Sequence, residues 1–273
     1  MLNTEKRNPN SKNIDKSTTQ EILQIIQAEN INAVNAVGNV IVDITKACDI
    51  AYECYKNGGR IIYIGAGTSG RTGVIDAVEC PPTYGIEQGK IIGVIAGGEK
   101  CMFRAAEGEE DNGDAGINDL KNINLSSLDV LIGISANGNA EYVIKALEYA
   151  KSLGSKTIGL TNNHGVKLES VPDVAIVVDS GAEVVTGSTR MKAGTVQKLV
   201  LNMISTTVMI KMGYVYENLM INLKAKNKKL IGRMVSIMQE IVEVSEQDAL
   251  KFLADNDYDI KKAIESYKNQ KKS

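Results

Sequence analysis

The chain has 273 residues, of which 43% are hydrophobic and 23% charged, so it can bury a substantial core, which excludes a disordered protein. Its 31 Lys and Arg nearly balance its 33 Asp and Glu. A formal net charge of -2 excludes the strong positive field that gathers nucleic acid or an anionic membrane surface, and we expect neither as a partner. Any anion must be bound by local groups.

The distribution of polar residues and cysteines indicates a cytoplasmic protein. Residues 1–20 are polar and lack the apolar core of a secretory signal, and the longest apolar stretch, 199–212, is interrupted by polar residues. The four cysteines show no C-x-x-C spacing and only one histidine, His164, accompanies them, so we expect no metal. Thiols without a disulfide pattern are typical of a reducing compartment.

Residues 18–55 carry helical periodicity in two segments. Ser17 or Thr18 can cap the first helix, and the pair Gly58-Gly59 can end the second. The pattern therefore predicts an N-terminal helical arm, which we assign to residues 1–57.

Five short apolar runs, each flanked by turn or polar residues, are typical of buried parallel strands. Helical patterns alternate with them, so the fold class is α/β, with a doubly wound five-stranded parallel sheet over residues 58–224. The strands are expected at residues 60–64, 90–95, 129–134, 156–160 and 174–178, and the helices at 70–78, 100–107, 140–153 and 191–212.

The C-terminal region, residues 225–273, is helical by pattern. An amphipathic helix is expected over residues 227–243 and short helices over 245–268, where Ser245 followed by Asp248 marks a helix start. This region resembles a small three-helix module of the ubiquitin-associated (UBA-like) kind. We assign no ligand to it, because a fold does not imply a function.

The first expected strand runs directly into a glycine-rich loop, residues 65–70, and a helix pattern follows. Such a loop can cradle a phosphate with backbone N–H groups, hydroxyls and the positive end of a helix. Dinucleotide-binding loops also follow a first strand, but here no lone acidic residue closes the second strand, which favours a sugar phosphate over NAD. The candidate ligand-binding residues are Gly67, Thr68, Ser69 and Gly70.

Two further polar segments precede helices. The third strand ends in residues 135–139, and the carboxyl ends of parallel strands meet at one edge of a sheet, so both loops can close on one ligand. Before the last long helix, Ser188 or Thr189 can act as a cap, while Arg190 or Lys192 can face an anion or, for Lys192 equally, form a surface salt bridge. The added candidates are Ser135, Asn137, Gly138, Asn139, Ser188, Thr189 and Lys192.

Several strings of this sequence resemble the N-acetylmuramic acid 6-phosphate etherases, a family with the sugar isomerase (SIS) fold. The resemblance covers residues 4 to about 222. The strings are TEKRN (4–8), NID (13–15), GGRIIYIGAGTSGRTGVIDAVECPPTYG (58–85), AAEGEEDN (105–112) and EVVTGSTRMKAGTVQKLVLNMISTT (183–207).

The resemblance implies a lyase that removes the lactyl ether from carbon 3 of N-acetylmuramic acid 6-phosphate, in cell-wall amino sugar recycling. Elimination and hydration give N-acetylglucosamine 6-phosphate and D-lactate, and need no metal or organic cofactor. Matching the motifs implies that Glu79 protonates the departing lactate and that Glu110 acts at carbon 2.

Spacing also suggests how the site is assembled. If the helix is straight from Ser69 to Glu79, ten residues separate them by about 15 Å, roughly twice the span of one phosphosugar. Glu79 would then serve the phosphate loop of a neighbouring subunit. We therefore expect a homodimer with a shared site.

The second loop departs from the family pattern, which has Ser-Gly-Arg-Thr-Pro where this chain has Asn137-Gly138-Asn139-Ala140-Glu141. Asparagine amides can still donate, but Glu141 beside a phosphate would repel it. Two alternatives follow. One is a non-catalytic regulator that senses a sugar phosphate; the other is an aldose-ketose isomerase, for which His164 is the one candidate to open the sugar ring.

Overall fold

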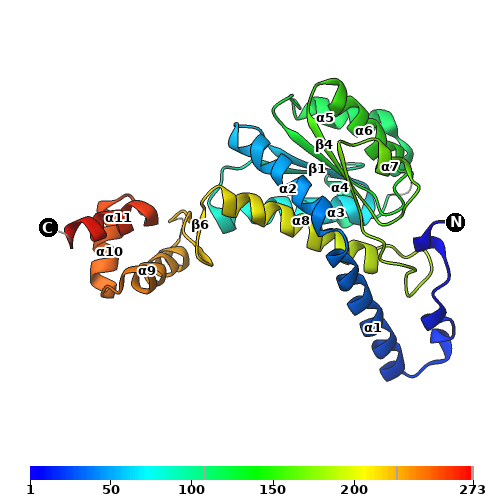
Figure 1. Ribbon diagram of the computed structural model, residues 1–273, viewed down its shortest axis with the longest axis horizontal. Coiled ribbons are helices and arrows are strands. Elements are labelled where there is room, and N and C mark those ends of the chain that lie inside the picture. Colours follow the sequence, from blue (N-terminus) through cyan, green and yellow to red (C-terminus); the bar gives the residue numbers. More distant parts are fainter. Residues whose placement is uncertain (107, 226, 272–273) are drawn as a thin grey trace. The chain divides into compact units, whose positions relative to one another are not determined.

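The computed structural model describes residues 1–106, 108–225 and 227–271 (Figure 1). The chain forms two compact units. The first contains Met1–Val78 and Gly89–Val208, and the second contains Glu79–Gln88 and Met209–Ser273. The three domain ranges expected from the sequence stay a prediction.

The first unit is built on the predicted five-stranded parallel sheet. Its order is β2-β1-β3-β4-β5, so β1 and β3 are neighbours although β2 separates them in the chain. This crossover places the ends of β1 and β3 side by side, since Gly65 pairs with Ile134. The strands are β1 (Ile61–Gly65), β2 (Ile91–Ile95), β3 (Val130–Ile134), β4 (Lys156–Thr161) and β5 (Val174–Val177).

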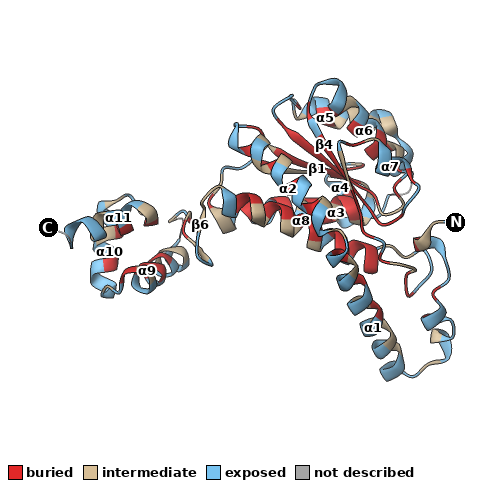
Figure 2. Cartoon of the chain, viewed as in Figure 1, coloured by how far each residue is buried: buried red, intermediate tan, exposed pale blue. Residues whose placement is uncertain are grey.

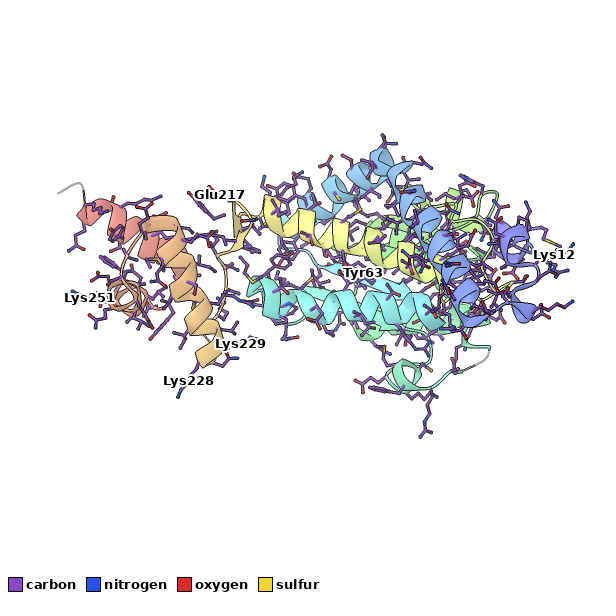
Figure 3. The ribbon with its side chains drawn as sticks, turned by 90° about the horizontal axis from the view of Figure 1, so that it is seen from below. Lys12, Tyr63, Glu217, Lys228, Lys229 and Lys251 are labelled. Carbon is purple, nitrogen blue, oxygen red and sulfur yellow. The ribbon has the colours of Figure 1, made fainter. Side chains whose placement is uncertain are left out.

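Alternating side chains of β1 face two helical layers, as expected for a sheet covered on both sides. Ile62 and Ile64 join a cluster with helix α6 (Glu141–Ser152). Tyr63 points the other way, between α3 (Gly67–Tyr84) and α8 (Lys192–Lys211), and donates its hydroxyl to Asp76 at 2.7 Å (Figure 3). All five residues of β1 are buried.

The N-terminal arm consists of α1 (Thr19–Gly38) and α2 (Ile41–Lys56), preceded by three short 3-10 helices, η1 (Asn3–Glu5), η2 (Pro9–Ser11) and η3 (Ile14–Lys16). Thr18, and not Ser17, caps α1: its hydroxyl accepts from Glu21 N, and the Glu21 carboxylate accepts from Thr18 N. Much of α1 is exposed, whereas most of the sheet and much of α8 are buried (Figure 2).

Helix α3 is longer than expected, because it continues through Pro81 and Pro82 to Tyr84. The expected end at Val78 was wrong: proline lacks an N–H and ordinarily ends a helix near the residue before it. The helix closes where Gly85, with a φ of +63°, donates to Pro81 O at 2.9 Å. Glu79 therefore lies inside a helix and not at its end.

The expected helix at 100–107 is also shorter, and Glu107 lies outside the described residues. α4 covers only Lys100–Phe103, and a 3-10 helix, η4 (Glu109–Asp111), follows Gly108, whose φ of +78° interrupts a helix. The next helix, α5 (Gly113–Asn122), was not predicted; it packs on α6. A short α7 (Lys167–Ser170) was missed as well.

The second unit has its own apolar core beside a short antiparallel hairpin, β6 (Val215–Tyr216) and β7 (Leu219–Met220). Three helices pack on one another: α9 (Lys228–Val242), α10 (Glu246–Asp255) and α11 (Ile260–Gln270). Ser245 caps α10 as predicted, by accepting from Asp248 N at 3.1 Å. The likeness to a UBA-like module stays a prediction. Within the described ranges, no helix combines the length and apolarity needed to cross a bilayer.

Candidate active site

The glycine-rich loop joins β1 to the first turn of α3, as the sequence predicts. α3 begins at Gly67, whose φ of +52° is in the region that favours glycine. The first N–H groups of a helix have no acceptor within the helix, so this turn presents donors to an anion. Ser69 is buried, at 7% exposure, and Thr68 is half-buried, so both residues are partly shielded from bulk water.

The loop is packed too tightly for a side chain at Gly70. A Cβ there would lie 2.5 Å from Gly65 O and 2.7 Å from Ile95 Cγ1. The methyl group of Thr68 lies over Gly194, near the start of α8, at 3.1 Å from where a Cβ on Gly194 would be. The glycine-rich loop and the start of α8 are therefore in contact.

The second loop follows β3 and is held both by its own polar groups and by hydrogen bonds from the segment that follows β4. Asn137 Oδ1 accepts from Ser135 Oγ at 3.0 Å and from Asn139 N at 2.9 Å, and Ser135 Oγ accepts from Gly138 N at 3.1 Å. Gly138 has a φ of +73°. The Asn-Gly-Asn turn thus builds a closed loop without the family's hydroxyl and cation.

Glu141 begins α6 directly after this loop, but its charge is compensated. Its carboxylate pairs with the ammonium group of Lys167 in an ion pair at the surface. The hydrogen bond and the charge of Lys167 hold the pKa of Glu141 below its ordinary value. The repulsion of a phosphate expected from Glu141 is therefore weakened by a cation in contact with it.

The turn before α8 carries Ser188 and Thr189, but a residue that the sequence did not single out caps the helix. The buried carboxylate of Glu183 accepts from Lys192 N and Ala193 N, each at 2.9 Å. The capping role expected for Ser188 or Thr189 was therefore wrong. A glutamate nine positions before the helix gives no local capping signal.

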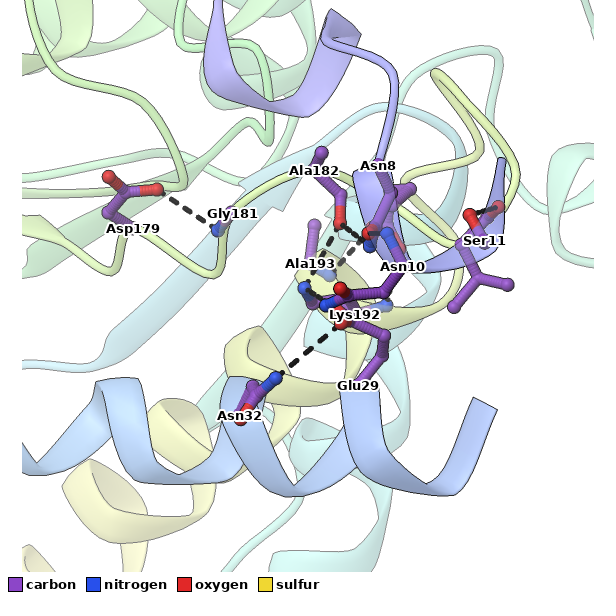
Figure 4. A network of polar contacts seen from close by, with 12 residues as sticks. Asn8, Asn10, Ser11, Glu29, Asn32, Asp179, Gly181, Ala182, Lys192 and Ala193 are labelled. Atoms are coloured by element: carbon purple, nitrogen blue, oxygen red, sulfur yellow. Dashed lines mark hydrogen bonds and ion pairs between the residues drawn. The ribbon is translucent and has the colours of Figure 1, made fainter. Parts of the chain in front are cut away.

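Lys192 lies in an ion pair that is buried, whereas the sequence left an anion ligand and a salt bridge at the surface equally open. Its Nζ is 2.5 Å from Glu29 Oε2 and donates to Ala182 O at 3.0 Å, and both charged side chains are at most 4% exposed (Figure 4). Asn10 Nδ2 adds a bond to Glu29 Oε1 at 2.8 Å. The pair ties α1 to α8 at one edge of a cavity of about 470 Å³. A role of Lys192 in ligand binding stays a prediction.

Replacing Glu29 by Gln should destabilise the protein by about 3–5 kcal/mol at neutral pH, because Lys192 is left charged and buried without its partner. Burial raises the pKa of Glu29, but hydrogen bonds from Asn10 and Lys192 outweigh it and hold this pKa below 4.5. A carboxyl group whose pKa is lower in the folded than in the unfolded protein stabilises the folded state at pH values above its unfolded pKa. This stabilisation is lost as the pH falls through its folded pKa.

Denaturant unfolding of wild type and Glu29→Gln between neutral pH and about pH 3 measures the stability that the Glu29–Lys192 pair contributes. We expect the difference in the free energy of unfolding to shrink as the pH drops below about 4.5. Glu53→Gln, on an exposed position of α2, is the control. A difference that stays constant with pH would contradict the assignment.

Arg71, in the first turns of α3, was missed as a structural anchor. Its guanidinium donates to Cys101 O at 2.6 Å, Met102 O at 3.2 Å and Arg104 O at 3.1 Å. These bonds hold α4 and Arg104 to the helix that starts in the glycine-rich loop. From the sequence, an arginine directly after the glycine-rich loop suggests a ligand for an anion. Its partners are instead backbone carbonyl groups about 30 residues away in the chain, which the sequence does not indicate.

The two candidate catalytic glutamates are exposed and lie in different compact units. Glu110 is the middle residue of η4, in the first unit. Glu79 lies in the second unit, on α3, where its carbonyl accepts from the Thr83 hydroxyl at 2.7 Å. Their catalytic roles stay a prediction. The loops at residues 67–70 and 135–139 and the start of α8, in contrast, come together in the first unit.

Known proteins with this fold include sugar-phosphate enzymes. The family profile of the SIS domain matches residues 113–207, and that of the glucokinase regulatory protein N-terminal SIS domain matches residues 43–151. A phosphoheptose isomerase from Francisella tularensis has a TM-score of 0.55 at 18% identity, over 71% of this chain and 100% of that chain. A phosphoheptose isomerase from Neisseria gonorrhoeae has a TM-score of 0.54 at 21% identity, over 70% and 98%. These likenesses show the fold.

Closer relatives define the family. The N-acetylmuramic acid 6-phosphate etherases of Bacillus pumilus and Clostridium botulinum are each 48% identical to this chain over 263 residues. The alignment covers 96% of this chain and 87% of each relative. Identity at this level over nearly the whole chain indicates membership of the same family and not only a shared fold. This chain belongs to the N-acetylmuramic acid 6-phosphate etherase family.

Proposed function

We propose that this protein cleaves the lactyl ether of N-acetylmuramic acid 6-phosphate to N-acetylglucosamine 6-phosphate and D-lactate. The observation that carries the proposal is the 48% identity to such etherases over 96% of the chain. The phosphate loop supports it, because an anion fits the N–H groups at the start of α3 and the hydroxyls of Thr68 and Ser69.

The chemistry needs two groups that handle protons at different atoms. In the open-chain sugar the aldehyde makes the proton on carbon 2 acidic, and Glu110 removes it. The bond between carbon 3 and the ether oxygen breaks, and Glu79 protonates the departing lactate. Water then adds to carbon 3 of the unsaturated aldehyde and a proton returns to carbon 2. Atoms balance without a metal or an organic cofactor.

The decisive test is D-lactate release from N-acetylmuramic acid 6-phosphate by the purified protein. We expect lactate and N-acetylglucosamine 6-phosphate in equal amounts. The changed second loop favours one competing function, a sensor of sugar phosphates. A protein that binds N-acetylglucosamine 6-phosphate but releases no lactate would be such a sensor.

We further infer a homodimer in which Glu79 of one subunit works with Glu110 and the phosphate loop of the other. The length of α3 supports this, since about 15 Å of helix separates Ser69 from Glu79. The face of α1 supports it too, because Leu23 and Ile31 are 62% and 51% exposed beside a hollow of about 710 Å³. Exposed apolar patches of this kind mark interfaces.

Mixing two inactive variants tests the shared site. After subunit exchange, Glu79→Gln and Glu110→Gln chains should form mixed dimers with one intact site each, which restores about a quarter of wild-type activity. Light scattering checks that the particle is a dimer. Mixtures that stay inactive while mixed dimers form would place both glutamates of a site in one subunit.

We place the protein in the cytoplasm, where a phosphorylated amino sugar from the cell wall would be recycled. The cysteine pattern supports this location, because thiols without a disulfide pattern are typical of reducing compartments.

A further inference from the structure

The string TEKRN, residues 4–8, has no part in the proposed chemistry, yet two of its polar residues are buried. Thr4 is 0% exposed and Asn8 is 5% exposed, although they lie near the start of the chain in a segment of short 3-10 helices. Polar side chains in such segments are ordinarily exposed, and burying them is favourable only with hydrogen-bond partners. The identity of those partners indicates what the segment does.

Thr4 is paired with Asn163, which follows the end of β4 and is 1% exposed. Thr4 N donates to Asn163 Oδ1 at 3.2 Å, and Asn163 Nδ2 donates to Thr4 Oγ1 at 3.0 Å. The two residues therefore recognise each other with three different groups: a backbone amide, a hydroxyl and a side-chain amide. Valine at position 4 or aspartate at position 163 would keep the size of the side chain but lose one of the two hydrogen bonds of the pair.

Each member of the pair also holds one of the candidate ligand-binding segments. Asn163 Nδ2 donates to Ala136 O at 2.8 Å, inside the second loop. Thr4 O accepts from Gly187 N at 3.2 Å, directly before Ser188. A chain of hydrogen bonds thus runs from the second loop through Asn163 and Thr4 to the turn before α8.

The rest of the N-terminal segment holds the same turn at two more points. Asn8 Nδ2 donates to Ala182 O at 3.1 Å, and Ser11 Oγ donates to Val184 O at 2.7 Å (Figure 4). The turn between β5 and α8 lacks regular secondary structure, so its carbonyl groups need such donors. Residues 4–11 therefore supply the hydrogen bonds that a neighbouring strand would supply elsewhere.

We propose that Thr4 and Asn163 are positioning residues of the phosphosugar site. They fix the spacing between the second loop and the turn at residues 187–189, so that both meet one phosphosugar. The inference rests on the proposed function, because it assigns those segments to the substrate. A displacement of about 1 Å at such a site can cost about 100-fold in rate, which is why indirect contacts of this kind matter.

The test compares kinetic constants for variants at position 4 and position 163. Thr4→Val removes the hydroxyl at nearly constant shape and should lower kcat/KM about 10-fold, whereas Thr4→Ser should stay within about 2-fold of wild type. Asn163→Asp removes both donated hydrogen bonds and sets a carboxylate against the Ala136 carbonyl oxygen, and should cost about 100-fold. Dissociation constants for N-acetylglucosamine 6-phosphate should rise in the same order.

Two control variants lose a similar hydrogen bond away from these segments. Thr45→Val removes a hydroxyl that donates to Ile41 O at 2.8 Å, and Asn57→Ala removes an amide that donates to Glu53 O at 2.9 Å. Both should keep wild-type kinetics. A merely structural pair would lower the unfolding temperature of the Thr4 and Asn163 variants and leave their kinetic constants unchanged well below it, which would overturn the proposal.

The binding measurement separates this proposal from the proposed function. If the wild type releases no D-lactate but the Thr4 and Asn163 variants bind N-acetylglucosamine 6-phosphate more weakly, the etherase assignment fails and the positioning role stands. If lactate is released and Thr4→Val and Asn163→Asp retain wild-type kcat, KM and product affinity, the positioning role fails alone.

Discussion

Glu79→Gln and Glu110→Gln should each lower D-lactate release by about 10²- to 10⁴-fold, the usual contribution of a positioned acid or base. Glutamine keeps the size of glutamate but can neither take nor deliver the proton. Both positions are exposed, so the variants should fold and still bind N-acetylglucosamine 6-phosphate. Glu109→Gln, beside Glu110 in η4, and Glu87→Gln, on an exposed position of the second unit, are matched controls.

Exchange of the carbon 2 proton in deuterated water distinguishes the two roles. If Glu110 removes this proton, Glu79→Gln should still exchange it while releasing no lactate, and Glu110→Gln should do neither. The reverse pattern, with proton exchange kept in Glu110→Gln and lost in Glu79→Gln, would show that Glu79 removes the carbon 2 proton and Glu110 protonates the lactate. Normal lactate release from either variant would remove that residue from the mechanism.

Gly70→Ala should raise the dissociation constant for N-acetylglucosamine 6-phosphate at least about 100-fold and destabilise the protein by about 1–3 kcal/mol. The added Cβ would lie 2.5 Å from Gly65 O and 2.7 Å from Ile95 Cγ1. The first of these atoms belongs to the backbone and cannot rotate away, so the first turn of α3 must move off the end of β1. That movement displaces the N–H groups that would bind the phosphate.

Calorimetric titration with N-acetylglucosamine 6-phosphate and denaturant unfolding measure the two effects of Gly70→Ala. Gly38→Ala is the matched control, since a Cβ at Gly38 meets nothing within 4 Å. This variant, at the last residue of α1, should be neutral or up to about 1 kcal/mol more stable, with unchanged binding. Product affinity equal to wild type in Gly70→Ala would show that the loop does not hold the phosphate.

The sheet could be predicted from the sequence because each strand is a short apolar run between polar or turn residues, and a parallel strand is buried on both faces. The end of β5 at Val177, for example, differs from the expected end by one residue. The prediction failed where local signals conflict with tertiary contacts. Pro81 and Pro82 indicate a helix end, yet α3 continues through them.

The polar network of the site shows the same limit. The glycine-rich loop has a local signature, glycines and hydroxyls between a strand and a helix, and its position between β1 and α3 was predicted from it. Glu183 instead caps a helix from 9 positions away, and Thr4 and Asn163 pair across 159 positions of the chain. Contacts of such range leave no periodicity or spacing in one sequence.

The two ligand loops differ in how much sequence change they can absorb. In the first, Gly70 packs against the backbone of Gly65, and no volume is left for a larger residue. In the second, Gly138 is also fixed, since a Cβ there would lie 2.3 Å from Val166 Cγ2, but Asn137 and Ser135 close the turn with their own side chains, so other self-closing residues can replace these two. We therefore expect substitutions that change the ligand preference to occur in the second loop, while the first loop stays constant because it is proposed to bind the phosphate.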